Sequence, residues 1–473
     1  MCDSSVRRWE FQSTIVTDWS DKSQLRQVVH DYRAVLLTIG QMILDRYERE
    51  EGYHFVDTKF SLLTGQDFVE SDPIRGRGAI YGWIQGRALE SLASLDAWIA
   101  RQAWLPPALR EELHRRIEKL LREVLDQLEE LRRANGGRLF FLMDRHGRPG
   151  KVTPEGDVAV QATSSGLPTS MTDLYYCIGK ATTSCLLGMQ ERLEEACREF
   201  LEICADLRGG KFYLGQVPLD PRNSMVEPVK GKLFHLGRTI AIKGAGRFLE
   251  CTRDGRFLDI GLEFMDYVLE RYVNLGDAPA FGACYDMWEF TGEDGRPYIE
   301  NGTLLNDPGT VMESVGFSLK LARLARAMRL VDKGNARRIE RIEAVAPEIL
   351  KRCFATGFSS NGLGLVRAVD LLSGKCLNDH LSWWGQMEGL RSAVLAAEVV
   401  ATGHRRAIEA LAAHASNAYI GHFIRPDLNL MAYQTIDQNG KPVDAIPATP
   451  DADVLYHTGL CLFDCLDVLD KRI

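Results

Sequence analysis

Several features that would assign this 473-residue chain to a familiar class are missing from it. The eleven cysteines are an odd number and include no C-x-x-C pair, which excludes a zinc ribbon and disfavours a disulfide framework. No stretch approaches the roughly 18 consecutive apolar residues of a membrane span. The N-terminal segment also lacks the apolar core of a secretory signal. These absences predict a reduced, cytoplasmic protein with no membrane partner.

Concentrated positive charge is missing as well. The chain has 57 Lys and Arg against 65 Asp and Glu, a net charge of −8, and no basic cluster of the kind that binds nucleic acid. Two glycine pairs, Gly76-Arg77-Gly78 and Gly244-Ala245-Gly246, are too short or too deep in a predicted helix to form a phosphate loop. No residues have metal-ligand spacing. We therefore expect no nucleic-acid partner, no metal and no cofactor.

Amphipathic helices dominate what is present. Apolar residues recur at i, i+3, i+4 and i+7, the period of a helix with one apolar face. This pattern predicts twelve helices, over residues 22–49, 79–101, 106–134, 171–188, 190–207, 232–252, 256–273, 309–329, 335–356, 383–402, 404–423 and 453–471.

Alternate helices differ in composition. Those beginning near 79, 171, 232, 309, 383 and 453 are richer in small and apolar residues than the helices between them. A helix that is apolar nearly all round is buried, whereas a one-sided helix lies outside. Regular alternation of the two kinds indicates a repeated helix pair. We therefore predict an all-α fold, an (α/α)6 barrel of six inner and six outer helices. No linker divides the chain, so residues 1–473 are predicted to form one domain.

Short extended segments with turn signatures interrupt the helices, at 139–149, 293–297, 372–375 and 433–443. Asp-x-x-Gly and Asn-Gly sequences supply the positive φ that hairpin turns need. Because each segment precedes an inner helix, we expect short β-hairpins at one mouth of the barrel, the alternative being that any one merely connects helices. The segment 209–231 is expected to cover the same mouth, where it would set substrate choice or contact a second subunit in a homodimer.

The first turns of the inner helices should meet at this mouth, where free N–H groups favour anionic or oxygen-rich ligands. These turns and the residues beside them carry aromatic rings, which stack on sugar C–H faces, and polar groups, which bind hydroxyls. The predicted substrate-binding residues are Tyr81, Trp83, Gln85, Asp173, Tyr176, His235, Asp307, Thr310, His380, Trp383, Trp384 and Gln386.

Two carboxylates, Glu313 and Glu388, lie within otherwise apolar inner helices. An unpaired carboxylate in such a position is costly. The two therefore indicate either a functional pair or a buried salt bridge to Arg87 or Arg391. Just ahead of the first inner helix, Arg75 and Arg77 would suit an anionic substrate, or pair with acidic neighbours.

Six segments in order along the chain have the look of known motifs. They are Trp83-Ile84-Gln85-Gly86-Arg87, Thr172-Asp173-Leu174-Tyr175-Tyr176, Phe234-His235, Asn306-Asp307-Pro308-Gly309-Thr310-Val311-Met312-Glu313, Trp383-Trp384-Gly385-Gln386-Met387-Glu388 and Tyr456-His457. The series resembles the N-acylglucosamine 2-epimerase superfamily, whose members include sugar 2-epimerases and aldose–ketose isomerases. The W-W-x-Q-x-E segment is the most specific of the six.

The resemblance implies proton transfer on a free reducing sugar in its open-chain form, through an enediolate, with no cofactor. It assigns proton transfer to His457, support of the sugar oxygen to Arg87 and orientation of a histidine to Glu313. Glu388 is the fourth catalytic candidate, and His235 would contact the substrate.

One departure from the family pattern is at Thr310, where the superfamily has a second catalytic histidine. A threonine hydroxyl cannot act as a general base near neutral pH. His457 alone could move a proton between C1 and C2 on one face, which suits isomerisation better than epimerisation. Two other readings stay open. One is a glycoside hydrolase that uses two of the carboxylates Asp173, Asp307, Glu313 and Glu388, and the other is a non-catalytic sugar-binding protein.

Overall fold

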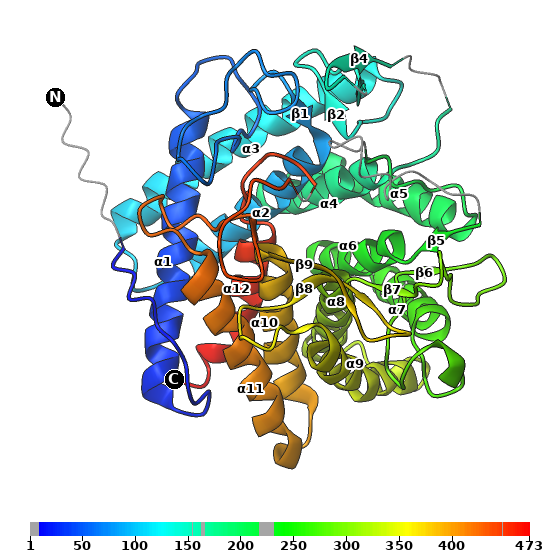
Figure 1. Ribbon diagram of the computed structural model, residues 1–473. Helices are drawn as coiled ribbons and strands as arrows, with labels where there is room; N and C mark the ends of the chain where they lie inside the picture. The colour runs from blue at the N-terminus through cyan, green and yellow to red at the C-terminus, as the bar shows by residue number, and fades with distance from the viewer. Residues whose placement is uncertain (1–8, 154, 162–165, 217–230, 447) are drawn as a thin grey trace.

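The computed structural model describes residues 9–153, 155–161, 166–216, 231–446 and 448–473, so most of the segment 209–231 lies outside the described residues. Within these ranges twelve α-helices form where the apolar periodicity predicts them (Figure 1). They are α1 (Lys22–Tyr47), α2 (Gly82–Ala100), α3 (Pro107–Ala134), α4 (Met171–Leu186), α5 (Gln190–Arg208), α6 (Leu236–Thr252), α7 (Gly255–Tyr272), α8 (Pro308–Ala327), α9 (Ala336–Gly357), α10 (Trp383–Val399), α11 (Thr402–Ala418) and α12 (His457–Leu469).

The even-numbered helices form a closed inner ring. Each packs against the next, from α2 through α4, α6, α8 and α10 to α12, and α12 packs back onto α2. The odd-numbered helices lie outside them, with α3 on α2, α5 on α4, α7 on α6, α9 on α8, α11 on α10 and α1 on α12. Figure 1 shows α1, from the start of the chain, beside the α10–α12 side of the ring. The predicted (α/α)6 barrel is confirmed.

Burial explains which helices are inside. Every residue of α10 from Trp383 to Ala397 is buried, whereas α3 buries only one stripe, from Leu113 to Leu131 at three- and four-residue steps. One hydrophobic cluster runs through the ring and includes side chains from Val16 to Leu469. Among the described helices, none combines the length and apolar composition needed to cross a bilayer.

Short strands gather at one end of the ring. β1 (Ile80–Tyr81) pairs with β2 (Leu142–Met143), β3 (Gly150–Val152) with β4 (Val158–Val160), and β5 (Leu233–Phe234) with β6 (Phe290–Thr291). β7 (Leu305–Asn306), β8 (Val366–Asp370), β9 (Cys376–Ser382) and β10 (Thr435–Ile436) form one antiparallel sheet in the order β10-β9-β8-β7. Because β1, β5, β7 and β9 lead into α2, α6, α8 and α10, these strands lie at the N-terminal mouth.

The four predicted turns are present, with Gly147, Gly295, Gly374 and Gly440 at φ values of 80°, 78°, 69° and 76°. The sequence predicted separate hairpins. In the structure β8 pairs with β7 and β9 pairs with β10, so the β8–β9 hairpin is part of a four-stranded sheet. Strand edges expose unpaired N–H and C=O groups, and pairing with β7 and β10 satisfies them.

Three inner helices begin three or four residues later than predicted, at 82, 236 and 457 instead of 79, 232 and 453. β1 and β5 occupy the residues before the first two. Before the third, Asp453 accepts hydrogen bonds from the backbone N–H of Tyr456 and Thr458 at 2.9 and 2.8 Å, which positions the start of α12. Tyr81 and His235 consequently lie at helix caps and not within helices.

Candidate active site

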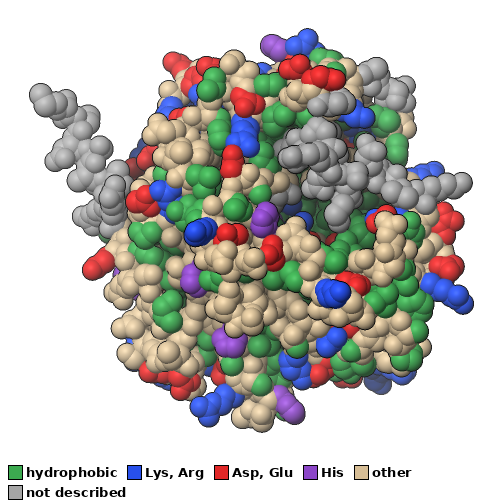
Figure 2. All heavy atoms as spheres, viewed as in Figure 1, with side chains coloured by type: hydrophobic (Ala, Val, Ile, Leu, Met, Phe, Trp, Pro, Cys, Tyr) green, Lys and Arg blue, Asp and Glu red, His purple; other side chains and the backbone are tan. Residues whose placement is uncertain are grey.

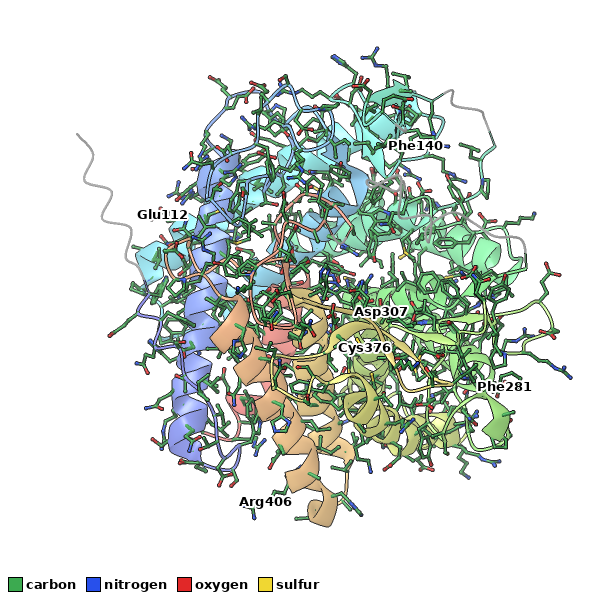
Figure 3. The ribbon with its side chains drawn as sticks, in the orientation of Figure 1. Glu112, Phe140, Phe281, Asp307, Cys376 and Arg406 are labelled. Atoms are coloured by element: carbon green, nitrogen blue, oxygen red, sulfur yellow. The ribbon has the colours of Figure 1, made fainter. Side chains whose placement is uncertain are left out.

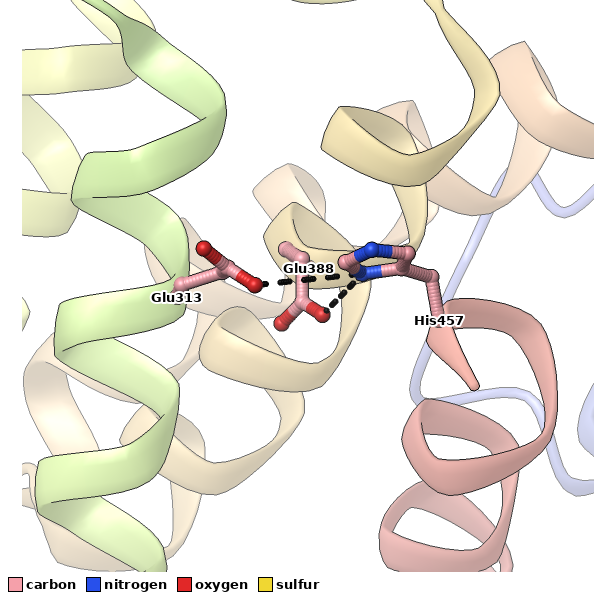
Figure 4. A group of neighbouring side chains, drawn as sticks. All are labelled: Glu313, Glu388 and His457. Carbon is pink, nitrogen blue, oxygen red and sulfur yellow. Dashed lines mark hydrogen bonds and ion pairs between the residues drawn. The ribbon is translucent and has the colours of Figure 1, made fainter. Parts of the chain in front are cut away.

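Glu313, Glu388 and His457 are buried side chains from three inner helices that meet inside the ring (Figure 4). Arg87, Glu313 and Glu388 are each the sixth residue of helices that begin at 82, 308 and 383, so they lie at a similar depth below the mouth. His457, the first residue of α12, completes the group. Its Nδ1 is 2.9 Å from Glu388 Oε1 and 3.9 Å from Glu313 Oε1. Only the shorter contact is a hydrogen bond, so Glu388, and not Glu313 as the resemblance implied, orients the His457 ring.

The two carboxylates have opposite electrostatic surroundings. Glu388 also bonds the guanidinium of Arg391, one turn further along α10. Burial opposes ionisation of Glu388, but Arg391 and the hydrogen bond from His457 outweigh it and lower the Glu388 pKa. Burial and the negative charge of Glu388 raise the pKa of Glu313 to about 8, although Arg87 opposes the shift. At neutral pH the pair therefore holds one carboxylate and one carboxylic acid, as in sites where neighbouring carboxyls take different roles.

His457 is placed as a proton acceptor. Burial lowers its pKa, and the Glu388 hydrogen bond only partly offsets that effect, so the ring is neutral at neutral pH. Donation from Nδ1–H to Glu388 leaves Nε2 as the basic nitrogen. Figure 4 shows this second nitrogen on the side of the ring away from both carboxylates. The rings of Trp384 and Tyr456 lie 5.4 and 4.9 Å from it between centroids.

Arg87 supplies positive charge beside this group. Its Nη2 donates to the hydroxyl of Tyr175 at 2.8 Å, and its guanidinium lies 4.3 and 4.6 Å from the ring centroids of Tyr175 and Tyr456. Its buried Nε has no hydrogen-bond partner among the described residues. Arg87 therefore retains a donor for a negatively charged oxygen, which is the function expected of a cation beside a developing oxyanion.

A second polar group lies at the N-terminal ends of α6 and α8. Glu289 Oε2 accepts a hydrogen bond from Thr310 Oγ1 at 2.8 Å and one from the backbone N–H of Asp307 at 3.2 Å. His235 Nε2 is 3.8 Å from the same oxygen. Asp307, labelled in Figure 3, caps α8 and is ion-paired with Arg367. The sequence analysis did not identify Glu289. The one sequence feature that could have indicated it is an acidic residue between two aromatic residues, Trp288 and Phe290, directly ahead of a predicted turn.

Solved structures with this architecture act on sugars. A cellobiose 2-epimerase from Spirochaeta thermophila DSM 6192 is similar, with 14% identity, a TM-score of 0.66 and coverage of 95% of this chain and 98% of that one. A D-mannose isomerase has 13% identity, a TM-score of 0.61 and coverage of 96% and 99%. A GH76A α-1,6-mannanase from Salegentibacter sp. HEL1_6 has 12% identity, a TM-score of 0.50 and coverage of 93% and 100%. At these identities the likeness shows a shared fold.

No curated protein matches the sequence. Residues 248–461, which contain the α8, α10 and α12 motifs, match the family model of N-acylglucosamine 2-epimerase (GlcNAc 2-epimerase). The match covers a little less than half of the chain, and it supports the resemblance carried by the ordered motifs.

Two glutamines of the ordered motifs hydrogen-bond the backbone of neighbouring segments. Gln85 accepts from the N–H of Val56 and donates to its C=O, both at 2.8 Å. Gln386 does the same to Leu365, at 2.7 and 3.1 Å, and also donates to the C=O of Ser382 at 3.0 Å. Both side chains hold extended segments against the mouth of the barrel.

The side chains of three more of the predicted binding residues have structural partners. Tyr81 donates to the C=O of Ile74 at 2.9 Å, and Tyr176 donates to Glu129 on the outer helix α3 at 2.5 Å. Asp173 forms a capping box with Ser170 at the start of α4. His380 lies on β9, and its backbone N–H donates to Asn378 Oδ1 at 3.1 Å.

Aromatic residues pack around the two polar groups. Trp384 packs against Gly309, where an added Cβ would come within 2.4 Å of its ring, and the Arg367 guanidinium lies 5.2 Å from the ring centroid. Trp383 is 6.1 Å from the His457 ring, and Trp83 lies 5.4 Å from the Arg87 guanidinium.

Two groups of residues in the described part of the chain have the spacing of metal ligands. Glu313, Glu388 and His457 each offer a ligand atom within 4.8 Å of the others. Arg391 already compensates the charge of Glu388, so this arrangement favours proton transfer. The other group, Glu129, Glu195 and Glu199, surrounds the ammonium of Lys180 at 2.6 to 3.1 Å.

The charges at the rim of the mouth are also paired. Arg75 Nη1 lies 3.1 Å from Asp444, and Arg77 is ion-paired with Glu50 and, at 3.3 Å, with Asp57. These pairs are the acidic neighbours that the sequence analysis gave as one alternative. On the face in Figure 2, Lys and Arg side chains are interspersed with Asp and Glu.

Proposed function

We propose that this protein is a sugar isomerase or epimerase that acts on the open-chain form of a free reducing sugar. The observation that carries the proposal is the hydrogen bond of His457 Nδ1 to the buried, ionised Glu388, beside a carboxyl at Glu313 whose pKa is raised to about 8. A neutral imidazole, a carboxylic acid and the Arg87 guanidinium within one ring are the groups that enediolate chemistry needs.

The proposed reaction begins at His457 Nε2, which removes the proton from the carbon next to the sugar carbonyl. The electrons of that C–H bond form the double bond of the enediolate, and the carbonyl oxygen takes up negative charge beside Arg87. Glu313, protonated at neutral pH, donates a hydrogen bond or its proton to a substrate oxygen. Protonation of carbon then yields the ketose or the epimeric aldose. Glu388 stabilises His457 while the ring is protonated, and it fixes the tautomer.

A glycoside hydrolase is the second candidate, because Glu313 and Glu388 have the split pKa values of an acid and a base. Both Glu388 oxygens, however, are engaged, one by His457 and the other by Arg391. A carboxylate held in this way is poorly placed to attack a sugar or to activate water. The isomerase or epimerase proposal accounts for His457 and Arg87 as well.

Incubation with free aldoses and ketoses in D2O, followed by NMR, tests the proposal. We expect deuterium at C2 of one sugar and the appearance of a ketose or a C2 epimer. Release of reducing sugar from glycosides without any exchange would favour the hydrolase. A His457→Gln variant that exchanged as fast as wild type would exclude His457 as the base.

The charge of the substrate, the oligomeric state and the cellular location of the protein stay predictions. The ion pairs of Arg75 and Arg77 favour an uncharged substrate over an anionic one. A homodimer remains the predicted assembly, which light scattering would test. Cytoplasmic localisation is predicted from the cysteine usage, the N-terminal segment and the lack of long apolar runs, and all ten cysteines of the described residues are free thiols.

A further inference from the structure

We propose that Glu289, held by Thr310 and backed by His235, is a second acid–base residue that occupies the place of the histidine missing at position 310. The inference rests on the proposed function, and it specifies the reaction as 2-epimerisation. It follows from the hydrogen bonds of the polar group at the starts of α6 and α8, which the mechanism above does not use.

The chain brings this group to the mouth that His457 faces. Glu289 directly precedes β6, which pairs with β5, and β5 leads into the α6 cap residue His235. Thr310 is in the first turn of α8. Next to it, Gly309 contacts Trp384, whose ring lies 5.4 Å from that of His457. The second polar group is therefore adjacent to the first, across the Trp384 ring.

Hydrogen bonding gives Glu289 a fixed orientation and one free oxygen. Oε2 receives the Thr310 hydroxyl at 2.8 Å and the Asp307 N–H at 3.2 Å. Among the described residues no donor reaches Oε1. Thr310 cannot itself accept a proton from carbon, but as a donor it holds a carboxylate that can. The substitution of histidine by threonine is thus matched by a carboxyl beside it.

His235 has an unusual contact with this carboxylate. The ring is fully buried, its Nδ1 lies 3.0 Å from Thr239 Oγ1, and its Nε2 has no hydrogen-bond partner among the described residues. Nε2 faces Glu289 Oε2 at 3.8 Å. A buried polar atom without a partner costs free energy, so Nε2 is a donor or acceptor left available beside the Glu289 carboxylate. Asp307 adds a second carboxyl, whose pKa burial raises to about 6, with the charge of Glu289 contributing.

The proposed step balances as two proton transfers with no redox change. His457 Nε2 takes the C2 proton, the C–H electrons form the C1–C2 double bond, and the carbonyl π electrons move to O1. Glu289, when it carries a proton, then donates it to C2 from the opposite face. The double-bond electrons form the new C–H bond, and the C1 carbonyl re-forms. His457 is left protonated and Glu289 ionised, and both return to their starting states by proton exchange with solvent. The product is the C2 epimer.

Glu289→Gln separates the two transfers. In D2O we measure exchange at C2 of recovered substrate, which reports His457, and formation of the C2 epimer, which needs both residues. We expect the variant to retain exchange and to lose epimer formation by about 100-fold or more, the usual contribution of a general acid or base. Equal loss of both signals, or loss of neither, would overturn the inference.

Thr310 is a positioning residue and provides a second test that keeps the carboxyl in place. Thr310→Ser retains the hydroxyl and should retain epimerisation, whereas Thr310→Val should lower kcat for epimer formation with little change in KM and displace its pH profile. Thr182→Val is the matched control, since this buried hydroxyl donates to a helix carbonyl at 2.8 Å in α4. Indistinguishable Ser and Val variants would contradict the role of Thr310.

Failure of this inference differs from failure of the proposed function. Wild-type protein that exchanges no proton with any sugar would contradict the proposed function itself. Wild-type protein that exchanges C2 and forms ketose but no epimer would leave that function in place and contradict the role of Glu289 alone.

Discussion

His457 Nδ1 donates to Glu388 Oε1 over 2.9 Å and so joins the first residue of α12 to the second turn of α10. Arg391 bonds the same carboxylate from one turn below. The three residues form a buried chain of charge in which the carboxylate both selects the His457 tautomer and compensates the imidazolium. This relationship gives the first prediction.

Glu388→Gln should lower kcat/KM by about 100-fold, because an amide neither fixes the tautomer nor balances a protonated ring. Steady-state kinetics on the sugar found by NMR measures the effect. Glu398→Gln, at an exposed position of the same helix, is the control and should be neutral. A Glu388 variant within threefold of wild type would exclude the proposed role.

The pH dependence should reflect Glu313. Its carboxyl must be protonated to donate to the substrate and has a pKa of about 8, while burial lowers the pKa of His457, which must be neutral. We therefore expect a bell-shaped profile of kcat/KM with its alkaline limb near pH 8. Glu313→Gln keeps a donor and should lose this limb. An unchanged limb in the variant would assign it to another group.

The free energy of unfolding should also depend on the protonation of Glu313. The folded-state pKa of Glu313 lies above its unfolded value, so the free energy of unfolding falls as pH rises from about 4.5 through 8. Glu313→Gln removes this loss. The variant should gain several degrees in Tm over wild type at pH 8 and show almost no gain at pH 4.5. A gain independent of pH would contradict the assignment.

Gly309→Ala should reduce activity without unfolding the protein. Its Cβ would meet the Trp384 ring at 2.4 Å, so the ring must shift, and with it one wall of the His457 site. We expect a decrease in kcat with native circular dichroism. Gly246→Ala, on α6, is the matched control because its nearest neighbour would be at 3.7 Å. It should be active and more stable by about 0.5–1 kcal/mol.

Gln386→Leu tests whether that side chain has a structural function. The substitution leaves the buried N–H and C=O of Leu365 unpaired, which should cost about 2–4 kcal/mol in the free energy of unfolding. Urea denaturation monitored by fluorescence measures it. Gln190→Leu, at an exposed helix start, should change stability by less than about 0.5 kcal/mol. Equal stability of the two variants would contradict the interpretation.

The architecture could be predicted because each helix carries its own evidence. The apolar period is local, and so is the contrast between α10, buried throughout, and α3, buried along one stripe. The turn glycines also report local φ, as Gly147 and Gly440 show. Placement of Arg87, Glu313, Glu388 and His457 in one ring followed from the motif order, since inner helices with a common direction bring similar positions to a similar depth.

The sequence alone therefore determined the (α/α)6 barrel, the family pattern and the residues that converge. Only the tertiary structure decided which partner each polar group has. In the folded chain, His457 forms its hydrogen bond with Glu388 and not with Glu313. Gln85 and Gln386 form hydrogen bonds with the backbone, and Glu289 accepts one from Thr310. The physical reason is that periodicity and turn chemistry act over a few residues, whereas a hydrogen bond between residues 69 apart, as between His457 and Glu388, depends on how the helices pack.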